Sequence, residues 1–348
     1  MNENSKLLCG NEALVYGALL AGCDAYFGYP ITPASEIIES AARLFPALGR
    51  TFIQAESEIG SINMVMGAAA AGKRAMTGSS GLGISLMQES VSYMAGMELP
   101  CVIADITRSG PGIGNIGVEQ SDYFQIVKGG GHGAYRVPVL APASAQEMCD
   151  MAARAFDLAE KYKTPVYILA DGVIGQMMES VVLPEPREPR NVPADALAPG
   201  NPRTNCFTSI YLDADELERK NEALQAKYRE IEAREQDCEK FLTEDAEIVL
   251  VAYGIVSRIA KDAVAELRKR GVRAGLLRPK TLFPFPKNAC AQLAEKAQKF
   301  FCVELSNGQM IEDLRLAIEC KKPVELIHKL GGKLVSADAI VAAVQADT

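Results

Sequence analysis

Residues 24–45, DAYFGYPITPASEIIESAARLF, decide the fold of this chain. They begin with a short apolar run, DAYFGY, of the length and composition of a buried strand. Pro30 and Pro33 then interrupt any regular element, and the stretch that follows, PASEIIESAARLF, has helical periodicity. The stretch therefore predicts a strand, a stiff turn and a helix.

The same alternation continues on the C-terminal side of this unit. Strand-like and helix-like segments follow one another as TFIQ, SEIGSINMVMGAAAAG, RAMTGS, LGISLMQESVSYMAGM, PCVIADIT, YRVPVLAP, SAQEMCDMAARAFDLAEKY and TPVYILA. This rhythm predicts a doubly wound parallel sheet with helices on both faces. We expect this first α/β domain to span residues 1–182.

A change of composition marks the end of that domain. Six prolines fall within residues 183–205, which excludes a helix or a central strand there and predicts a linker. The charged residues 211–242 predict a mostly solvated helix, with a narrow apolar stripe of Leu217, Leu224, Tyr228 and Ile231. We assign residues 183–243 to this linker and helix. The β/α rhythm then returns and predicts a smaller α/β domain over residues 244–348.

Charge and hydropathy exclude several functions. The 36 basic and 44 acidic residues give a net charge of −8, which disfavours binding to nucleic acid. No uninterrupted apolar run reaches about 18 residues, so we expect no membrane span. The apolar N-terminal stretch is flanked by Glu3 and Glu12 and predicts a helix rather than a signal peptide.

Cysteine and histidine usage argues against a metal centre on this chain. The nine cysteines are widely spaced, with no C-x-x-C, so we expect no disulfide framework, zinc site or iron–sulfur cluster. Reduced thiols favour a cytoplasmic location. Only two histidines exist, and we interpret His132, in a glycine-rich loop, as a solvated residue rather than a catalytic one.

Two nucleotide-binding motifs are matched only superficially. GAAAAGKR, residues 67–74, has P-loop spacing, but Arg74 replaces the Mg²⁺-binding hydroxyl residue and the stretch closes a predicted helix instead of opening one. GIGNIG, residues 112–117, fits G-x-G-x-x-G but lacks the following helix and acidic residue. We interpret residues 108–117, RSGPGIGNIG, as a flexible active-site loop.

Three segments together resemble the α subunit of the 2-oxoacid:ferredoxin oxidoreductases. They are FGYPITPASE (27–36), QAESEIGSINMVMGAAAAG (54–72) and GSSGLGISLMQESVSYMAGMELPCVI (78–103). The resemblance covers nearly the whole chain, and AESE, SINMV and SDYFQ look most like subunits assigned to branched-chain 2-oxoacids. It implies a thiamine-diphosphate pyrimidine-binding domain followed by a transketolase C-terminal-like domain.

The resemblance makes Glu58 the expected catalytic residue. Enzymes of this kind hold N1′ of the cofactor's aminopyrimidine with one carboxyl group in an apolar, partly dry pocket. Glu58 precedes an apolar helix with no basic residue until Lys73, which suits that role. The alternative is that Glu58 only accepts hydrogen bonds from the free N–H groups at the start of the helix. Glu56 would fill that role equally well.

Other site residues follow from the same resemblance. Thr32 is expected to hydrogen-bond the 2-oxoacid, although it could be an ordinary turn residue, and Arg108 to clamp its carboxylate, within a residue or so of register. The turn Tyr29, Pro30, Ile31 and Thr32, together with Ser80 and Gly81, is expected to face the cofactor. Ser80 and Gly81 could instead merely cap a helix at Gly83.

The cofactor site is incomplete on this chain. The segment ADG, residues 170–172, with Asn201 lacks the first glycine of the diphosphate signature. We therefore expect the diphosphate and Mg²⁺ site on a β subunit, and iron–sulfur clusters on γ or ferredoxin-like subunits. CoA and ferredoxin complete the expected reaction, which is oxidative decarboxylation to an acyl-CoA by an oxidoreductase that acts on an oxo group.

Alternatives remain open. The substrate could be 2-oxoglutarate or pyruvate, the chain could belong to a thiamine enzyme without redox chemistry, or it could be a non-enzymatic anion-binding module. A 2-oxoglutarate enzyme needs a second cation for the distal carboxylate. Lys128 and Arg136 are the candidates near the loop, and neither is clearly aimed at the site. We therefore favour an apolar branched-chain oxoacid such as 2-oxoisovalerate.

Overall fold

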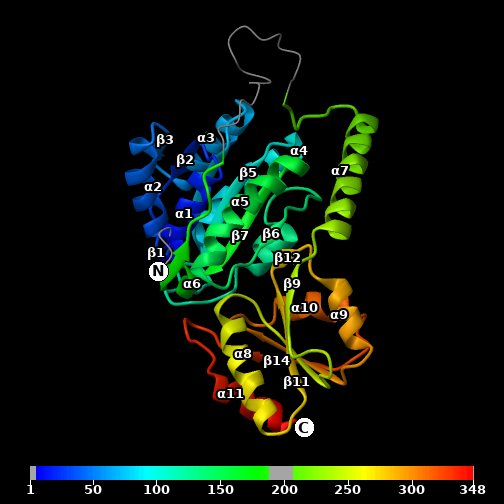
Figure 1. The fold of residues 1–348 in the computed structure, drawn as a ribbon. Coiled ribbons are helices and arrows are strands. Elements are labelled where there is room, and N and C mark those ends of the chain that lie inside the picture. The colour runs from blue at the N-terminus through cyan, green and yellow to red at the C-terminus, as the bar shows by residue number, and fades with distance from the viewer. Residues whose placement is uncertain (1–4, 188–206, 348) are drawn as a thin grey trace.

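The computed structural model describes residues 5–187 and 207–347, which form two α/β units, one below the other in Figure 1. The upper unit is built on a seven-stranded sheet with the order β12-β6-β7-β5-β4-β2-β3. Its strands are β2 (Ala25–Gly28), β3 (Thr51–Gln54), β4 (Ala75–Ser79), β5 (Cys101–Thr107), β6 (Val139–Leu140), β7 (Pro165–Asp171) and β12 (Thr281–Phe283). All pairs are parallel except β12 with β6, so the predicted parallel sheet is confirmed.

Helices connect successive strands of this sheet. They are α1 (Gly10–Leu20), α2 (Ser35–Ala47), α3 (Glu58–Ala70), α4 (Gly81–Met97), the π-helix η1 (Phe124–Gly129), α5 (Ala145–Tyr162) and α6 (Gly172–Gln176). Helix α1 packs on α5 so closely that a Cβ at Gly17 would lie 2.1 Å from the Cys149 carbonyl oxygen. Helix α3 packs on α4, beside β2 and β5. This is the doubly wound arrangement that the alternation predicted.

The N-terminal segment differs from its prediction. Residues 5–9 form a strand, β1 (Ser5–Cys9), and only then does α1 begin. Strand β1 pairs antiparallel with β8 (Met178–Val182), at the other end of the unit's sequence. Local periodicity gives no sign of such a distant partner, which is why a helix alone was expected.

The lower unit contains a five-stranded sheet with the order β14-β13-β10-β11-β9. Its strands are β9 (Cys238–Phe241), β10 (Ile248–Val251), β11 (Ala274–Pro279), β13 (Lys299–Glu304) and β14 (Val324–His328), and its helices are α8 (Gly254–Lys269), α9 (Lys287–Ala294), α10 (Met310–Ala317) and α11 (Ala337–Ala346). Strand β9 lies within the segment expected to be linker and helix. It joins this sheet antiparallel to β11.

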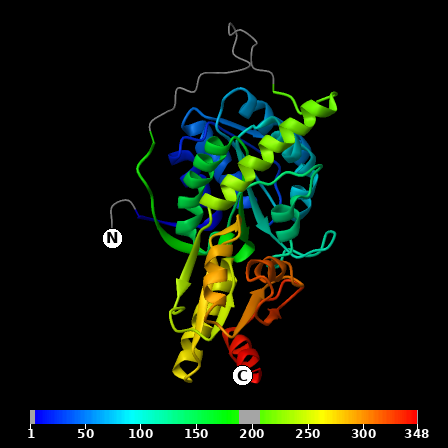
Figure 2. The same cartoon turned by 90° about the vertical axis from the view of Figure 1, so that its right-hand side faces the viewer.

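The predicted charged helix is α7 (Ala214–Arg234). Figure 2 shows it lying across the upper unit. Leu224, Tyr228 and Ile231 of the predicted stripe are buried, whereas Leu217 is 41% exposed. Lys220 and Lys227 both form ion pairs with Glu98 at the end of α4. The predicted linker lies mostly outside the described residues.

Buried polar contacts join the two units. The Arg278 guanidinium on β11 donates two hydrogen bonds of 2.7 Å to the Glu147 carboxylate on α5. Asp171, at the end of β7, accepts the N–H groups of Ile174 and Ile255, at the beginnings of α6 and α8. Because Arg278 and Asp171 are buried, these hydrogen bonds fix how the two units meet.

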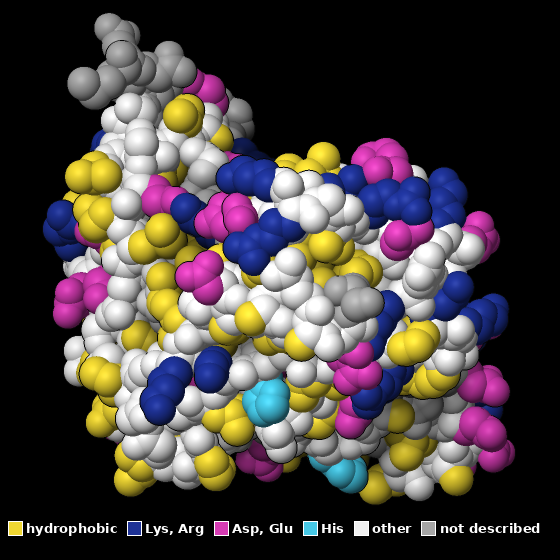
Figure 3. All heavy atoms as spheres, turned by 90° about the horizontal axis from the view of Figure 1, so that it is seen from below, with side chains coloured by type: hydrophobic (Ala, Val, Ile, Leu, Met, Phe, Trp, Pro, Cys, Tyr) yellow, Lys and Arg dark blue, Asp and Glu magenta, His cyan; other side chains and the backbone are white. Residues whose placement is uncertain are grey.

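Two surface properties bear on the expected partners. No helix in the described part of the chain is long and apolar enough to cross a membrane. On the face seen from below in Figure 3, basic and acidic side chains are interspersed. That face presents no broad basic area of the kind that binds nucleic acid.

Candidate active site

The predicted site residues gather at one edge of the upper sheet. Parallel strands β2, β4 and β5 all end there. Ser80 and Arg108 directly follow β4 and β5, and Thr32 comes four residues after the end of β2. The lower unit faces the same edge (Figure 1). Ligands of open α/β sheets bind at the carboxyl ends of the strands, so the position suits a catalytic site.

Glu58 is the first residue of α3 and is only 7% exposed. Glu56, two residues earlier, is exposed. The Ser57 hydroxyl accepts the Gly60 N–H at 3.2 Å and caps the helix, so this capping role does not fall to Glu58. No described residue donates a hydrogen bond to the Glu58 carboxylate. The geometry therefore separates the two glutamates and leaves Glu58 available to a ligand.

A glycine turn at the start of α4 lies against this carboxylate. A Cβ at Gly83 would come within 2.6 Å of Glu58 Oε1 and 2.1 Å of Ser79 Oγ. The helix begins at Gly81, and its N-cap residue Ser80 makes no side-chain capping bond. The buried hydroxyls of Ser79 and Ser80 have no partner among the described residues. The Ser80 hydroxyl therefore does not cap the helix, which argues against a purely capping role for this side chain.

The structure brings Arg108 and Thr32 together. Arg108 donates from Nη1 to the Thr32 carbonyl and from Nη2 to the Ile113 carbonyl, both at 3.1 Å. Both acceptors are neutral backbone groups, so the guanidinium keeps its full charge for an anionic ligand. Thr32 is exposed and Arg108 is half-buried.

The rest of the predicted turn lies beside this pair. Tyr29 is 38% exposed, Pro30 is exposed and Ile31 is half-buried. The described residues therefore leave this turn open to a ligand or to another chain.

A cavity of about 450 Å³ opens beside Arg108, between the two units. The upper unit lines it with Gly81, Leu82, Ser85, the loop Arg108–Gly112, Glu119, Ser121 and Asp122, and the lower unit with Asn307, Gln309, Leu330 and Gly331. Among these described residues Arg108 is the one cation. Residues 108–112 of the predicted active-site loop thus border this cavity.

Sequence reasoning missed the acidic side chains of this region. Asp105 on β5 is fully buried, Glu119 is 4% exposed, and Asp122 follows the glycine-rich loop. Burial raises the pKa of Asp105 well above its ordinary value, and the neighbouring Asp122 raises it further. Burial also raises the pKa of Asp122. The sequence did contain an indication of Asp105, because it is the one charged residue in the apolar strand CVIADIT.

The two candidate second cations point elsewhere. Lys128 forms an ion pair with Asp313 on α10, and the Arg136 guanidinium donates to the Lys128 carbonyl at 2.6 Å. Both side chains line a different cavity, of about 300 Å³, that includes Glu232 of α7 and Phe283. Neither is among the residues that line the cavity beside Arg108.

The rejected motifs behave as expected. Helix α3 ends at Ala70, so residues 67–74 close a helix and do not open one. Residues 112–117 form bends and turns, and His132 is exposed in a loop.

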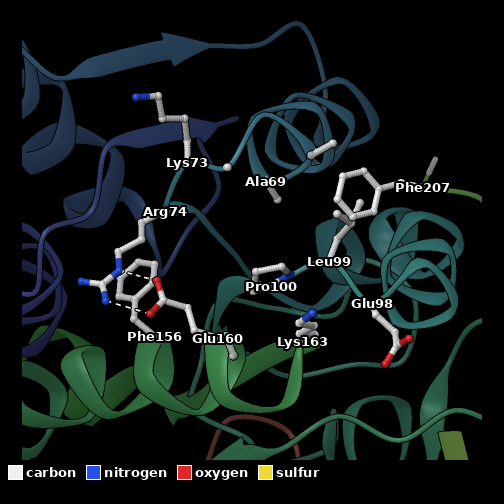
Figure 4. Close-up of a pocket in the computed structure, with 13 residues that line it drawn as sticks. Ala69, Lys73, Arg74, Glu98, Leu99, Pro100, Phe156, Glu160, Lys163 and Phe207 are labelled. Atoms are coloured by element: carbon white, nitrogen blue, oxygen red, sulfur yellow. Dashed lines mark hydrogen bonds and ion pairs between the residues drawn. The ribbon is translucent and has the colours of Figure 1, made fainter. Parts of the chain in front are cut away.

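A further cavity, of about 220 Å³, lies near the N-terminal ends of β4 and β5 (Figure 4). Arg74 lines it and is paired with Glu160 at 2.6 Å, while the lining residue Glu98 is paired with α7. It contains none of the predicted site residues, so we do not assign it to the active site.

Comparisons with known proteins identify the family of this chain. Residues 16–240 match the family described as pyruvate flavodoxin/ferredoxin oxidoreductase, thiamine diphosphate-binding, and residues 246–340 match pyruvate:ferredoxin oxidoreductase core domain II. The chain is 56% identical to the ketoisovalerate oxidoreductase subunit VorB of Methanothermobacter thermautotrophicus, over 95% of this chain and 94% of that one. It is 38% identical to the 2-oxoglutarate synthase subunit KorA of the same organism, over 93% and 94% of the two chains.

Solved structures extend the comparison. A 2-oxoglutarate:ferredoxin oxidoreductase from Magnetococcus marinus, with 2-oxoglutarate, coenzyme A and succinyl-CoA bound, superposes with a TM-score of 0.90 at 26% identity. The match covers 99% of this chain but 65% of that one, so the present chain spans less than two thirds of that relative. A split-gene transketolase shares the fold, with a TM-score of 0.61 at 16% identity. With both family matches and these relatives, the chain belongs to the pyruvate flavodoxin/ferredoxin oxidoreductase family of thiamine diphosphate-binding proteins.

Proposed function

We propose that this chain is the pyrimidine-binding, substrate-contacting subunit of an enzyme that oxidatively decarboxylates a branched-chain 2-oxoacid, such as 2-oxoisovalerate. The product is the acyl-CoA, and ferredoxin receives the electrons. The 56% identity to a ketoisovalerate oxidoreductase subunit supports the substrate class. The observation that carries the proposal is the cavity beside Arg108, which has one cation among its described lining residues.

The residues at the strand ends fit thiamine diphosphate. A buried carboxyl group at Glu58 has no donor among the described residues, and Gly83 leaves the space beside it free of a side chain. The unpartnered hydroxyls of Ser79 and Ser80 lie at the same turn. Buried polar atoms without partners are rare in folded proteins, and a bound polar ligand explains them. When bound, this cofactor supplies a carbanion and an electron sink for decarboxylation.

Glu58 has one chemical task in this arrangement. Its carboxyl group holds a proton at N1′ of the aminopyrimidine ring. The small exposure of Glu58 keeps water from competing for that hydrogen bond. Ile62 and Val65, which follow in α3, are buried and keep this part of the helix apolar.

Arg108 and Thr32 bind the substrate. The guanidinium binds the carboxylate that all 2-oxoacids share, and its bonds to Thr32 and Ile113 hold it in place. The Thr32 hydroxyl bonds the oxo-carboxylate end of the same molecule. Two contacts to one end of the substrate would hold it in a single orientation.

Selectivity for an apolar side chain follows from the charges around the cavity. A 2-oxoglutarate enzyme must neutralise a second carboxylate, because a buried unpaired charge costs several kcal/mol. Glu119 and Asp122 line this cavity and would repel that carboxylate, while Leu82 and Leu330 offer apolar contacts. Lys128 is bound by Asp313 and is not available for the task.

The missing parts come from partner chains. We assign the diphosphate and Mg²⁺ site to a β subunit, and the iron–sulfur clusters to γ or ferredoxin-like subunits. The described cysteines are scattered and unpaired, which supports this division. CoA and ferredoxin meet the complex through those partners, in the cytoplasm.

The test is co-purification of the native complex, followed by assays with 2-oxoisovalerate, 2-oxoglutarate and pyruvate in the presence of CoA and a viologen acceptor. We expect the highest kcat/KM for 2-oxoisovalerate. A preference for 2-oxoglutarate would overturn the substrate assignment and point to a cation from a partner chain. Decarboxylation without acceptor reduction would instead indicate a thiamine enzyme without redox chemistry.

A further inference from the structure

Asp105 and Asp122 form a pair of carboxyl groups behind the proposed substrate site, with Asp105 buried and Asp122 half-buried but its Oδ2 atom enclosed. Asp105 is fully buried near the end of β5, in register with Ser79 just before the Gly81 turn, and the neighbouring Asp122 carboxyl adds to the rise of its pKa that burial causes. Neither Asp105 oxygen, nor Oδ2 of Asp122, has a hydrogen-bond donor of normal geometry among the described residues. The described residues thus give these oxygens no hydrogen bond of normal geometry, although the Gly81 N–H favours the ionised form of both groups and the Arg108 charge favours that of Asp122.

Ionising both of two adjacent carboxyl groups inside a protein costs free energy. Each negative charge destabilises the other, because the protein interior screens charge poorly. A proton between them supplies the hydrogen bond that both otherwise lack. The pair then carries one negative charge instead of two.

The pair lies beside the residue that binds substrate. A Cβ at Gly81 would be 3.9 Å from Asp122 Oδ2 and 3.8 Å from Arg108 Cγ, so one glycine separates the carboxyl pair from the arginine. Gly83, in the same helical turn, contacts Glu58. Asp122 and Arg108 line the same cavity. The charge on the pair thus acts directly on the carboxylate-binding end of the site.

Other charged and titratable groups surround the pair and act on it in both directions. Glu119 opposes ionisation of Asp122, whereas the Arg108 charge and the Gly81 N–H favour it. Burial raises the pKa values of Tyr167 on β7 and Tyr253 beside α8, so both phenols are neutral near pH 7. Arg108 is therefore the one opposite charge among these described groups, and its guanidinium is bonded only to backbone carbonyls.

We propose that Asp105 and Asp122 share one proton at neutral pH and act as positioning residues, holding the Gly81 turn while leaving the charge of Arg108 available to the 2-oxoacid carboxylate. The role in substrate binding depends on the proposed function, whereas the shared proton does not. Loss of the proton at alkaline pH adds a second negative charge beside Arg108 and weakens substrate binding.

Two measurements on the reconstituted complex test this proposal, with Asp105→Asn as the main variant. The amide has the shape of the acid and donates to Asp122 without a shared proton. The infrared difference spectrum between wild type and Asp105→Asn at pH 7 should contain the C=O stretching band of a protonated carboxyl group. Asp150→Asn, an exposed position on α5, is the control and should remove no such band. Absence of the band in the wild type would overturn the shared proton, whether or not the complex oxidises oxoacids.

The second measurement is KM for the 2-oxoacid as a function of pH. In the wild type KM should rise at alkaline pH by on the order of tenfold, the effect of one added charge in a partly buried site. In Asp105→Asn this rise should be flattened, because the pair keeps one charge throughout. A variant that only melts at a lower temperature, with an unchanged KM profile, would contradict the positioning role. If Asp105→Asn fails to assemble, Asp122→Asn removes the same proton and decides the same two questions.

Discussion

Glu58 Oε1 and the backbone of Gly83 are so close that a Cβ added at residue 83 would lie 2.6 Å from that oxygen. Glu58 begins α3 and Gly83 lies in the first turn of α4, so two helix starts meet at the edge of the sheet. The contact determines where the carboxyl group points, because the neighbouring position holds no side chain. The contact also makes the site sensitive to replacement of Gly83 by alanine, which adds a single methyl group.

Gly83→Ala should therefore reduce activity of the reconstituted enzyme strongly, since the added methyl group overlaps both Glu58 and Ser79. The matched control is Gly67→Ala in α3, where a Cβ meets no atom within 4 Å. Alanine in place of glycine in a helix stabilises it by about 0.5–1 kcal/mol, so this control should keep its activity and melt no lower. Equal activities of the two variants would show that the Glu58 contact is irrelevant to catalysis.

Glu58→Gln should lower kcat by about 10²–10⁴-fold, because the amide keeps the shape of the side chain but cannot share a proton with N1′. Glu56→Gln is the control, since Glu56 is exposed and its effect should be mild. Steady-state assays and circular dichroism of both complexes separate catalysis from folding. Retention of most activity by Glu58→Gln would remove Glu58 from the mechanism.

Arg108→Lys should raise KM for the 2-oxoacid by about 10–100-fold, because charge-assisted hydrogen bonds contribute about 1.5–3 kcal/mol each and lysine cannot bind a carboxylate in the bidentate manner. The control is Arg43→Lys. The Arg43 side chain is 62% exposed, and its Nη2 atom lies 3.6 Å from Glu12 Oε1 in a surface ion pair. Its KM should be unchanged. An equal KM in both variants would place the carboxylate elsewhere.

Glu147→Gln should destabilise the contact between the two units. Arg278 is 6% exposed, and losing one partner of such a buried ion pair costs about 3 kcal/mol, moderated here by the second partner Glu239. Burial acts to raise the pKa of Glu147, but its hydrogen bonds to Arg278 outweigh this and hold the pKa below the ordinary value. The stabilisation by this ion pair is therefore complete above the pKa that Glu147 has in the unfolded chain. It is lost as the pH falls through the lower pKa that Glu147 has in the folded protein.

Thermal unfolding of the wild type and of Glu147→Gln across acidic and neutral pH measures this effect. The two melting temperatures should converge at low pH. Glu230→Gln is the control, because its ion pair with Arg234 is exposed and contributes little. A melting-temperature difference that does not depend on pH would contradict the ionic origin of the stabilisation.

The isolated chain should bind thiamine diphosphate weakly and be colourless. Most of the cofactor's charge is on the diphosphate, for which the chain lacks the expected signature, and its scattered cysteines make no cluster. Calorimetry with the cofactor and Mg²⁺, with and without the partner subunit, checks the first part. Tight stoichiometric binding to this chain alone would mean that the diphosphate site has been assigned to the wrong subunit.

The sequence by itself determined the alternation of strands and helices from β2 to β7, the family, and Glu58 as the candidate catalytic residue. Alternating apolar runs and helical periodicity are local properties, so chain order reveals them without any tertiary contact. The helix α7 was predicted for the same reason, with three of its four stripe residues buried. The spacing of Glu58 from the small-residue end of α3 distinguished it from Glu56 through the resemblance, and the burial of Glu58 agrees with that choice.

Only the tertiary structure decided which distant segments meet. Strand β12 comes from the C-terminal part of the chain yet pairs with β6 of the first sheet, and β1 pairs with β8. The same is true of the site. Lys128 forms an ion pair with Asp313 instead of lining the cavity beside Arg108, and Asp105 has Asp122 as a neighbour. Such pairings depend on packing between elements far apart in sequence, and local periodicity carries no information about them.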